Sequence, residues 1–134
     1  MRRLWMAVLF LFSTLAVASA VEEEWKAPAR AAKKRNPVAA DARSLASGKQ
    51  IYDRECASCH GAGGKGDGPS AKDLERPAGD LTDMTRAGIH TDGELFWKIT
   101  EGKKPMPALE DKLSEPERWD VVNYIRVFSA GSKS

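Results

Sequence analysis

The 134-residue chain contains 21 basic and 19 acidic residues and has a formal net charge of +2 at pH 7. Two of the basic residues and none of the acidic ones lie among the first 20 positions, so residues 21–134 hold 19 of each sign. Nucleic-acid-binding proteins usually need a strongly basic surface, and this balance argues against that class. The chain has two cysteines and two histidines, which are the natural candidates for a functional site.

Residues 1–20 have the pattern of a secretory signal peptide. Two arginines form a charged n-region, residues 7–15 form an apolar h-region, and Ala-Ser-Ala at positions 18–20 forms a small-residue cleavage site. The alternative is an uncleaved anchor, because residues 4–21 give 18 uncharged positions, barely enough to span a bilayer. The cleavage site favours export to the periplasm, and a membrane-anchored protein that faces the periplasm remains the alternative.

Residues 21–40 form an Ala-, Lys-, Glu- and Pro-rich segment in which Trp25 is the single aromatic residue. It contains an acidic run at 22–24 and a basic run at 33–35. Such a composition buries little apolar surface, so we expect a flexible tail or linker, with a binding arm as the alternative. Residues 41–134 are predicted to form one compact domain, which is small for a self-sufficient core.

The domain is predicted to open with a helix over residues 41–55. Its apolar and small residues recur at helical spacing: Leu45, Gly48, Ile51 and Tyr52. Five glycines and a proline then fall within residues 61–69, which are predicted to form a loop.

Between this helix and this loop lies Cys56-Ala57-Ser58-Cys59-His60, a C-x-x-C-H sequence typical of covalent c-type haem attachment. Two thiols three positions apart can each add to one of the two vinyl groups of a haem. The imidazole of His60 is then held under the ring, where it can bind the iron as the proximal ligand. The motif therefore predicts one covalently bound haem c.

Three other interpretations of the two cysteines compete with haem. A thioredoxin-like redox pair would sit in a βαβ pattern, which the sequence does not show. A structural zinc site needs four ligands, and a second pair of ligands is missing. A short disulfide would leave His60 without a role. Haem attachment accounts for all three residues.

Two further helices are predicted from capping boxes. Thr91 and Glu94 have the spacing of an N-cap and its N3 partner, and they open a helix over 92–101 that ends at Gly102. Ser114 and Glu117 open a last helix that runs through residue 128. That helix combines a polar stripe (Asp120, Asn123, Arg126) with a broad apolar face (Trp119, Val122, Tyr124, Ile125, Phe128). No strand-like alternation or internal repeat is visible, so we expect an all-α domain around one haem.

The sixth iron ligand has three candidates: Met106, Met84 and His90. Met106 lies between Pro105 and Pro107, and prolines stiffen the backbone on both sides of it. A stiff loop can hold a thioether on the iron, where it favours the ferrous state and raises the reduction potential. Met84 is better explained as core filler, and His90 as a surface or capping residue. We therefore predict Met106 as the distal ligand.

These motifs together resemble a class I bacterial c-type cytochrome. The attachment motif is followed by Gly61, and Lys65-Gly66-Asp67-Gly68-Pro69 resembles the usual loop after it. The Pro-Met-Pro sequence resembles the distal methionine loop, and residues 119–126 resemble the C-terminal helix. The resemblance implies an all-α cytochrome c fold, in which the N- and C-terminal helices cross through a small residue and aromatic residues. Gly48, Tyr52 and Tyr124 fit those roles.

The resemblance implies a monomeric carrier that moves one electron at a time between periplasmic redox partners and has no catalytic residue. One alternative is a haem c subunit of a periplasmic dehydrogenase or terminal oxidase. Another is a haem peroxidase or gas sensor with an open distal site. Four lysines are candidates for a basic rim at an exposed haem edge, although scattered lysines are more often plain solvated surface: Lys65, Lys98, Lys103 and Lys104.

Overall fold

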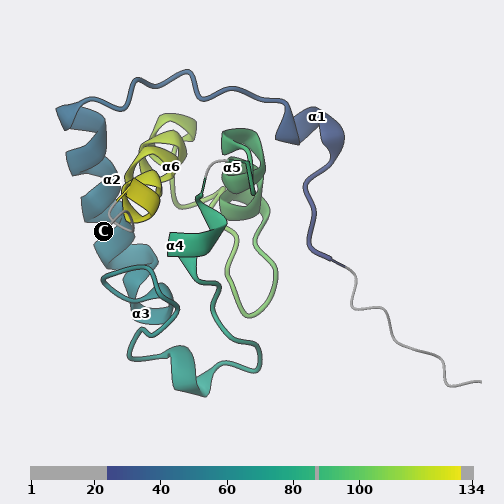
Figure 1. The fold of residues 1–134 in the computed structure, drawn as a ribbon, viewed down its shortest axis with the longest axis vertical. Coiled ribbons are helices and arrows are strands. Elements are labelled where there is room, and N and C mark those ends of the chain that lie inside the picture. Colours follow the sequence, from purple (N-terminus) through teal and green to yellow (C-terminus); the bar gives the residue numbers. More distant parts are fainter. Residues whose placement is uncertain (1–23, 87, 131–134) are drawn as a thin grey trace, which may run out of the picture.

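The computed structural model describes residues 24–86 and 88–130, and its helices pack around one core (Figure 1). The elements are α1 (Ala29–Ala32), α2 (Ala42–Glu55), α3 (Ala57–His60), the 3₁₀ turn η1 (Ala71–Asp73), α4 (Leu81–Met84), α5 (Asp92–Glu101) and α6 (Glu115–Ala130). The described residues contain no strand, and their one isolated β-bridge joins Lys103 and Met106. The prediction of an all-α fold is confirmed.

The predicted signal peptide, residues 1–20, lies outside the described residues. In the part of the chain that the structure describes, no helix has both the length and the apolar character needed to cross a membrane.

The three long helices begin at capping residues, and one of them, α5, also ends at a glycine. The Asp41 side chain accepts a hydrogen bond from the Ser44 amide at 2.9 Å, which caps α2. The Thr91 side chain accepts from the Glu94 amide at 3.1 Å, and α5 ends at Gly102, whose φ of +62° suits glycine.

The two predicted capping boxes differ in the structure. At the start of α6 the box is complete: the Ser114 amide donates to the Glu117 carboxylate at 2.8 Å, and the Glu117 amide donates to the Ser114 hydroxyl at 3.4 Å. At the start of α5 only the Thr91 half forms. The Glu94 carboxylate lies instead between His90 and Lys98, one turn away in each direction.

Helices α2 and α6 cross at Gly48. A Cβ atom at this position would overlap the carbonyl oxygen of Asp120 and lie 2.8 Å from the Cβ of Tyr124. Glycine therefore permits the close approach of the two backbones. The ring of Tyr52 lies 5.3 Å from that of Tyr124 and 5.2 Å from that of Phe128, next to the crossing. The residues expected at this crossing are confirmed.

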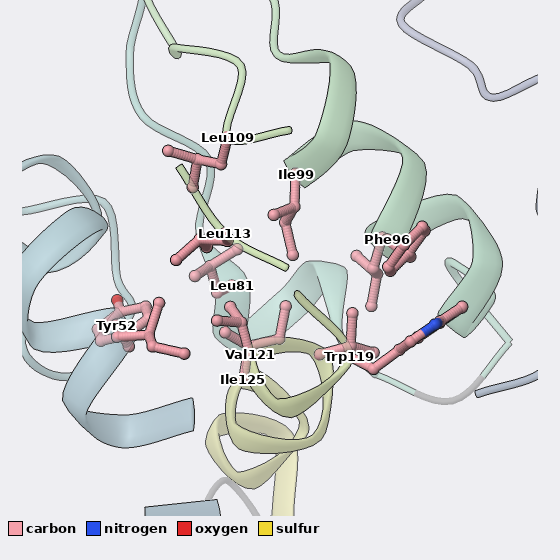
Figure 2. Packing of buried hydrophobic residues seen from close by; sticks show 12 residues of the cluster. Tyr52, Leu81, Phe96, Ile99, Leu109, Leu113, Trp119, Val121 and Ile125 are labelled. Carbon is pink, nitrogen blue, oxygen red and sulfur yellow. The ribbon is translucent and has the colours of Figure 1, made fainter. Parts of the chain in front are cut away.

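The core lies between α2, α5 and α6, where Figure 2 shows side chains from all three helices and from the segment before α6 meeting. The rings of Phe96 and Trp119 are stacked with centroids 3.9 Å apart. Among the residues that the structure describes, twelve hydrophobic ones are buried: Ile51, Tyr52, Leu81, Leu95, Phe96, Ile99, Leu109, Leu113, Trp119, Val121, Val122 and Ile125.

The polar stripe of α6 is an internal hydrogen-bonded seam. The Ser44 hydroxyl donates to Asp120 at 2.6 Å, and the Asn123 side-chain amide donates to the Ser44 hydroxyl at 2.9 Å. Arg126 donates to the carbonyl oxygens of Thr85 and His90. Buried polar groups are tolerated when they find partners in this way, so the stripe ties α6 to its neighbours.

Residues 24–40, which we call the N-terminal strap, run along α5 and then across the molecule to α2 (Figure 1). The Asn36 side-chain amide donates to Asn123 Oδ1 at 2.8 Å, and the Asn123 amide donates to the Val38 carbonyl at 3.1 Å. We expected a segment that buries little apolar surface, and none of residues 24–40 is fully buried. Its specific contacts with α5 and α6 were not expected, because its composition does not indicate them.

Candidate functional site

A cavity of about 520 Å³ lies against the C-x-x-C-H motif. Its size falls within the range of ligand and cofactor sites, about 300–1,000 Å³. It is bounded by the end of α2, by α3, by residues 74–84, by α5 and by residues 103–109. Five sulfur- or imidazole-bearing side chains line it: Cys56, Cys59, His60, Met84 and Met106.

One turn of helix places the three motif residues together. Cys56 is the C-cap of α2 and the N-cap of α3, and its carbonyl accepts a hydrogen bond from the His60 amide at 2.9 Å. Residues i, i+3 and i+4 of a helical turn share a face, which brings both thiols and the imidazole to the cavity.

The imidazole of His60 is held by a backbone carbonyl. Its Nδ1 atom lies 3.0 Å from the carbonyl oxygen of Gly79. A carbonyl can only accept, so Nδ1 carries the proton and Nε2 keeps a lone pair for a metal. Such a second hydrogen bond fixes both the ring orientation and the tautomer of a ligating histidine.

Met84 lies on the same side of the cavity as this hydrogen bond. A Cβ atom on Gly79 would lie 2.6 Å from Met84 Sδ, so the thioether packs directly on Gly79. Gly79 in turn contacts the His60 ring. This position suits a wall residue beneath the imidazole, in keeping with the expectation of core filler.

Met106 reaches the cavity from a tight loop. The Lys103 amide donates to the Met106 carbonyl at 3.1 Å, and the Met106 amide donates to the Lys103 carbonyl at 2.9 Å. A further bond from the Leu109 amide to the Ile99 carbonyl, at 3.1 Å, attaches the loop to α5. The backbone on both sides of the methionine is therefore fixed before any ligand binds.

His90 does not line the cavity. Its Nδ1 atom lies 3.0 Å from the Glu94 carboxylate, which is also 3.4 Å from Lys98 Nζ. Burial raises the pKa of Glu94, but the hydrogen bond from His90 and the charge of Lys98 outweigh it and hold the pKa below its ordinary value.

The structure corrects one part of the predicted basic rim. Lys98 is only 7% exposed and is paired with Glu94, so it belongs to the cavity wall. Lys65 does not line the cavity, whereas Lys103 and Lys104 do, together with Arg76.

Two of the competing interpretations of the cysteines, a thioredoxin-like redox pair and a structural zinc site, have no support in the described residues. The described residues form no βαβ unit, and burial raises the pKa of the Cys56 thiol to about 12, the opposite of an activated redox thiolate. No group of three or more His, Cys, Asp or Glu side chains in the described part of the chain is arranged to hold a metal ion by itself.

Sequence reasoning missed Gly79, Arg76 and the part of the strap that reaches the cavity. Arg76-Pro77-Ala78-Gly79 carries no local signal beyond its turn residues, and its role depends on contacts with His60 across 19 positions of sequence. The sequence did contain one signal for the strap's contact with the domain: Trp25 is an isolated aromatic residue in a polar segment.

The model of the family described as cytochrome c oxidase, cbb3-type, subunit III matches residues 43–125. The chain belongs to this c-type cytochrome family. It is a class I monohaem cytochrome with covalently bound haem c, because the matched segment includes a single C-x-x-C-H motif.

Curated relatives are cytochromes c6. That of Chlorolobion braunii is 33% identical over 89 residues, which cover 66% of this chain and 96% of the relative. That of Anabaena variabilis is 33% identical over 79 residues, or 59% of this chain and 85% of the relative. The chloroplastic cytochrome c6 of Chlamydomonas reinhardtii is 33% identical over 88 residues, 66% of this chain, and the match spans 57% of its length.

Two solved structures have the same fold. A chain of the reducing HAO-like protein complex of Kuenenia stuttgartiensis superimposes with a TM-score of 0.60 at 31% identity, covering 69% of this chain and 46% of that one. Another c-type cytochrome superimposes with a TM-score of 0.52 at 24% identity, covering 60% of this chain and 95% of that one. The second likeness concerns the fold alone.

The residues of the cavity fit a haem. Two thiols and an oriented imidazole converge on a largely apolar space, a thioether comes from a preorganised loop, and Arg76, Lys103 and Lys104 supply positive charge for carboxylate substituents.

Proposed function

We propose that the protein is an exported carrier of single electrons. In this proposal Cys56 and Cys59 form the thioethers to haem, His60 is the proximal iron ligand and Met106 is the distal one. The observation that carries the proposal is the convergence of these four side chains on one cavity, with His60 Nδ1 already bound to the Gly79 carbonyl.

When bound, the haem supplies an iron that gains and loses one electron. The protein's contribution is to hold the ligands still and to exclude water. His60 is fixed by Gly79, and Met106 is fixed by the two hydrogen bonds to Lys103. A site whose ligands are held in this way exchanges electrons with little rearrangement, so no acid or base is needed.

The cytochrome c6 relatives support a small carrier that meets its partners transiently. Redox encounters of this kind usually bury less than about 1,200 Å². Lys104 is exposed beside the cavity and gives a positive contact point for an acidic partner. Export to the periplasm belongs to the same proposal and rests on the signal sequence. The proposal also includes redox proteins as electron donor and acceptor, and a monomeric chain.

A second candidate is a haem c subunit of a larger oxidoreductase. The family name refers to an oxidase subunit, and one solved relative is part of a complex. Purification of the native protein separates the candidates: a carrier elutes at the mass of the single chain, and a subunit co-elutes with fixed partners.

The Met106→Ala variant tests the distal ligand and with it the carrier function. Loss of the thioether should open the iron, so the ferrous variant should bind carbon monoxide rapidly and its midpoint potential should fall. Wild type should bind carbon monoxide slowly near neutral pH. Met84→Leu is the matched control, because it alters the other cavity methionine, and it should behave as wild type.

Rapid carbon monoxide binding by the wild type would contradict the proposal and favour a peroxidase or gas sensor. An unchanged Met106→Ala variant would also contradict it, since the sulfur would then not be the ligand. A change of spin state in His90→Gln would also contradict the proposal, because it would assign the distal ligand to His90, which lies outside the cavity in this structure.

A further inference from the structure

The N-terminal strap is docked on α5 by backbone and side-chain contacts. The Thr91 hydroxyl, which caps α5, also donates to the Ala32 carbonyl at 2.6 Å. Lys34 Nζ lies 5.7 Å from the centre of the Phe96 ring, and Asn36 attaches the far end of the strap to α6. Single contacts of this kind are weak, but here they are spread over the length of the strap.

At Gly93, the backbone of the strap lies very close to the surface of α5. A Cβ atom there would overlap the carbonyl oxygen of Ala31 and lie 2.7 Å from that of Lys34. Glycine inside a helix costs about 1 kcal/mol relative to alanine. The contact with the strap explains why glycine occupies this helical position despite that cost.

The docked strap brings its other end to the cavity. Trp25 and Glu24 line the cavity together with Lys98. The Trp25 ring lies 6.3 Å from that of Trp97, and Lys98 Nζ lies 5.4 Å from the centre of the Trp25 ring. Lys98 is therefore enclosed between an aromatic ring and Glu94, which explains why a lysine at this position is 7% exposed.

We propose that Trp25 is a positioning residue that closes the α5 side of the haem cavity and keeps Lys98 desolvated beside it, so that the strap raises the reduction potential. This inference rests on the proposed function, since it needs haem in the cavity. It assigns to the N-terminal segment a role in the redox site itself.

The direction of the effect follows from charge. Ferric haem carries one more positive charge than ferrous haem, so a drier surrounding and a nearby cation both disfavour the ferric state. Solvent exposure is one of the factors that set such potentials. Removing the Trp25 ring admits water to the cavity, which lowers the midpoint potential. Because Glu94 pairs with Lys98 and offsets its charge, the exclusion of water is the main effect.

Two independent variants test the proposal on the holoprotein. Trp25→Ala removes the ring, and Gly93→Ala displaces the strap from α5 without touching the cavity. Each should lower the midpoint potential in a spectroelectrochemical titration while the ferric and ferrous spectra keep the wild-type form. Because both variants open the same side of the cavity, the double variant should show less than the sum of the two shifts.

Two matched controls accompany them. Trp25→Phe keeps an aromatic ring over Lys98 and should stay close to the wild-type potential. Gly63→Ala adds a methyl group at a glycine that has open space and no positive φ, and it should leave the potential unchanged. Trypsin cleavage at the basic run 33–35 gives a second measurement: Gly93→Ala should be cut faster than Gly63→Ala.

Unchanged or raised potentials in both Trp25→Ala and Gly93→Ala, with normal spectra, would overturn the proposal. Equal trypsin cleavage in Gly93→Ala and Gly63→Ala would overturn the docking of the strap on α5. A wild type that lacks covalent haem would contradict the proposed function instead, and its spectrum identifies that failure before any potential is compared.

Discussion

His60 Nδ1 lies 3.0 Å from the carbonyl oxygen of Gly79, and this hydrogen bond joins the two halves of the cavity wall. The bond orients the imidazole, and the thioether of Met84 packs against the same glycine. The position of the His60 ring is thus coupled to the volume available beside Gly79.

Gly79→Ala tests this coupling. The new methyl group would press on Met84 Sδ, which lies near the end of a flexible side chain and can shift, so we expect a loss of about 1 kcal/mol in the free energy of unfolding. Met84→Ala in the same chain makes room and should recover part of that loss. Denaturant titrations of the four members of this cycle should give a favourable coupling of about 0.5 kcal/mol between the two changes. Strict additivity would show that Met84 does not pack on Gly79.

The double change Cys56→Ala and Cys59→Ala should abolish covalent haem. Wild-type protein matured in a competent host should keep its haem through denaturing electrophoresis and acid-acetone extraction. The double variant should show no haem-stained band and should accumulate poorly, because the cavity then lacks the group that completes the core. His90→Gln, outside the cavity, should stain as wild type. A stained band from the double variant would refute the attachment.

Gly48→Ala should destabilise the fold. The added methyl group overlaps the Asp120 carbonyl at the crossing of α2 and α6, and overpacking of this kind costs about 1–3 kcal/mol. Alanine is the better helix former, so a surface glycine in α2 would have gained about 1 kcal/mol instead. Chemical denaturation should therefore show a loss for Gly48→Ala and little change for Gly63→Ala. A gain in stability would mean that the helices do not cross this closely.

The pH dependence of stability should contain a contribution from Glu94. Its folded pKa lies below the ordinary value of 4.5, so the folded state binds fewer protons than the unfolded state between the two values. Stability from Glu94 is therefore complete above pH 4.5 and is lost as the pH falls through the folded pKa. The groups that face it are His90, Lys98 and, at longer range, Lys26.

Glu94→Gln should remove this contribution. The difference in unfolding free energy between wild type and Glu94→Gln should shrink as the pH is lowered from 6 towards 3. The exposed Glu110→Gln is the control and should follow the wild-type curve at every pH. A constant difference for Glu94→Gln would show that the His90–Glu94–Lys98 contacts do not depend on the carboxylate charge.

The elements that were predicted correctly are those with local signals. Thr91 and Ser114, the predicted caps, each bind an amide three residues ahead, so a short stretch of sequence contains the whole interaction. Asp41 caps α2 in the same way, although it was not predicted as a cap. The role of Gly48 at the helix crossing was predicted from the resemblance to class I c-type cytochromes, and glycine suits such a close approach because it has no Cβ atom.

The elements that were missed depend on short segments or distant contacts. Helices α1, α3 and α4 have four residues each, too few to show a periodic pattern. The seam between Asn36 and Asn123 joins positions 87 apart, so nothing near Asn123 shows that its stripe is buried. The pairing that buries Lys98 has a pattern in the sequence, since Glu94 and Lys98 lie four residues apart on α5 and His90 precedes Glu94 by four residues, just before the helix.

The cavity also combines residues from compact local motifs with residues that only the fold brings together. The C-x-x-C-H motif and the Pro-Met-Pro loop mark four of its residues from sequence, because each is a compact motif. The walls between them come from residues 74–84 and from the strap, which have no such motif and take their roles from the fold.

Gly93 has a consequence for the evolutionary history of this chain. Because the strap's carbonyl oxygens occupy the space where its side chain would be, only a hydrogen atom is accommodated there while the strap is docked. A cytochrome without the strap is free of that restriction and gains helix stability from any larger residue. Among homologues, the residue type at position 93 should therefore vary together with the presence of an N-terminal extension. An alignment could thus show the gain or loss of the strap at position 93, about 60 residues further along the chain.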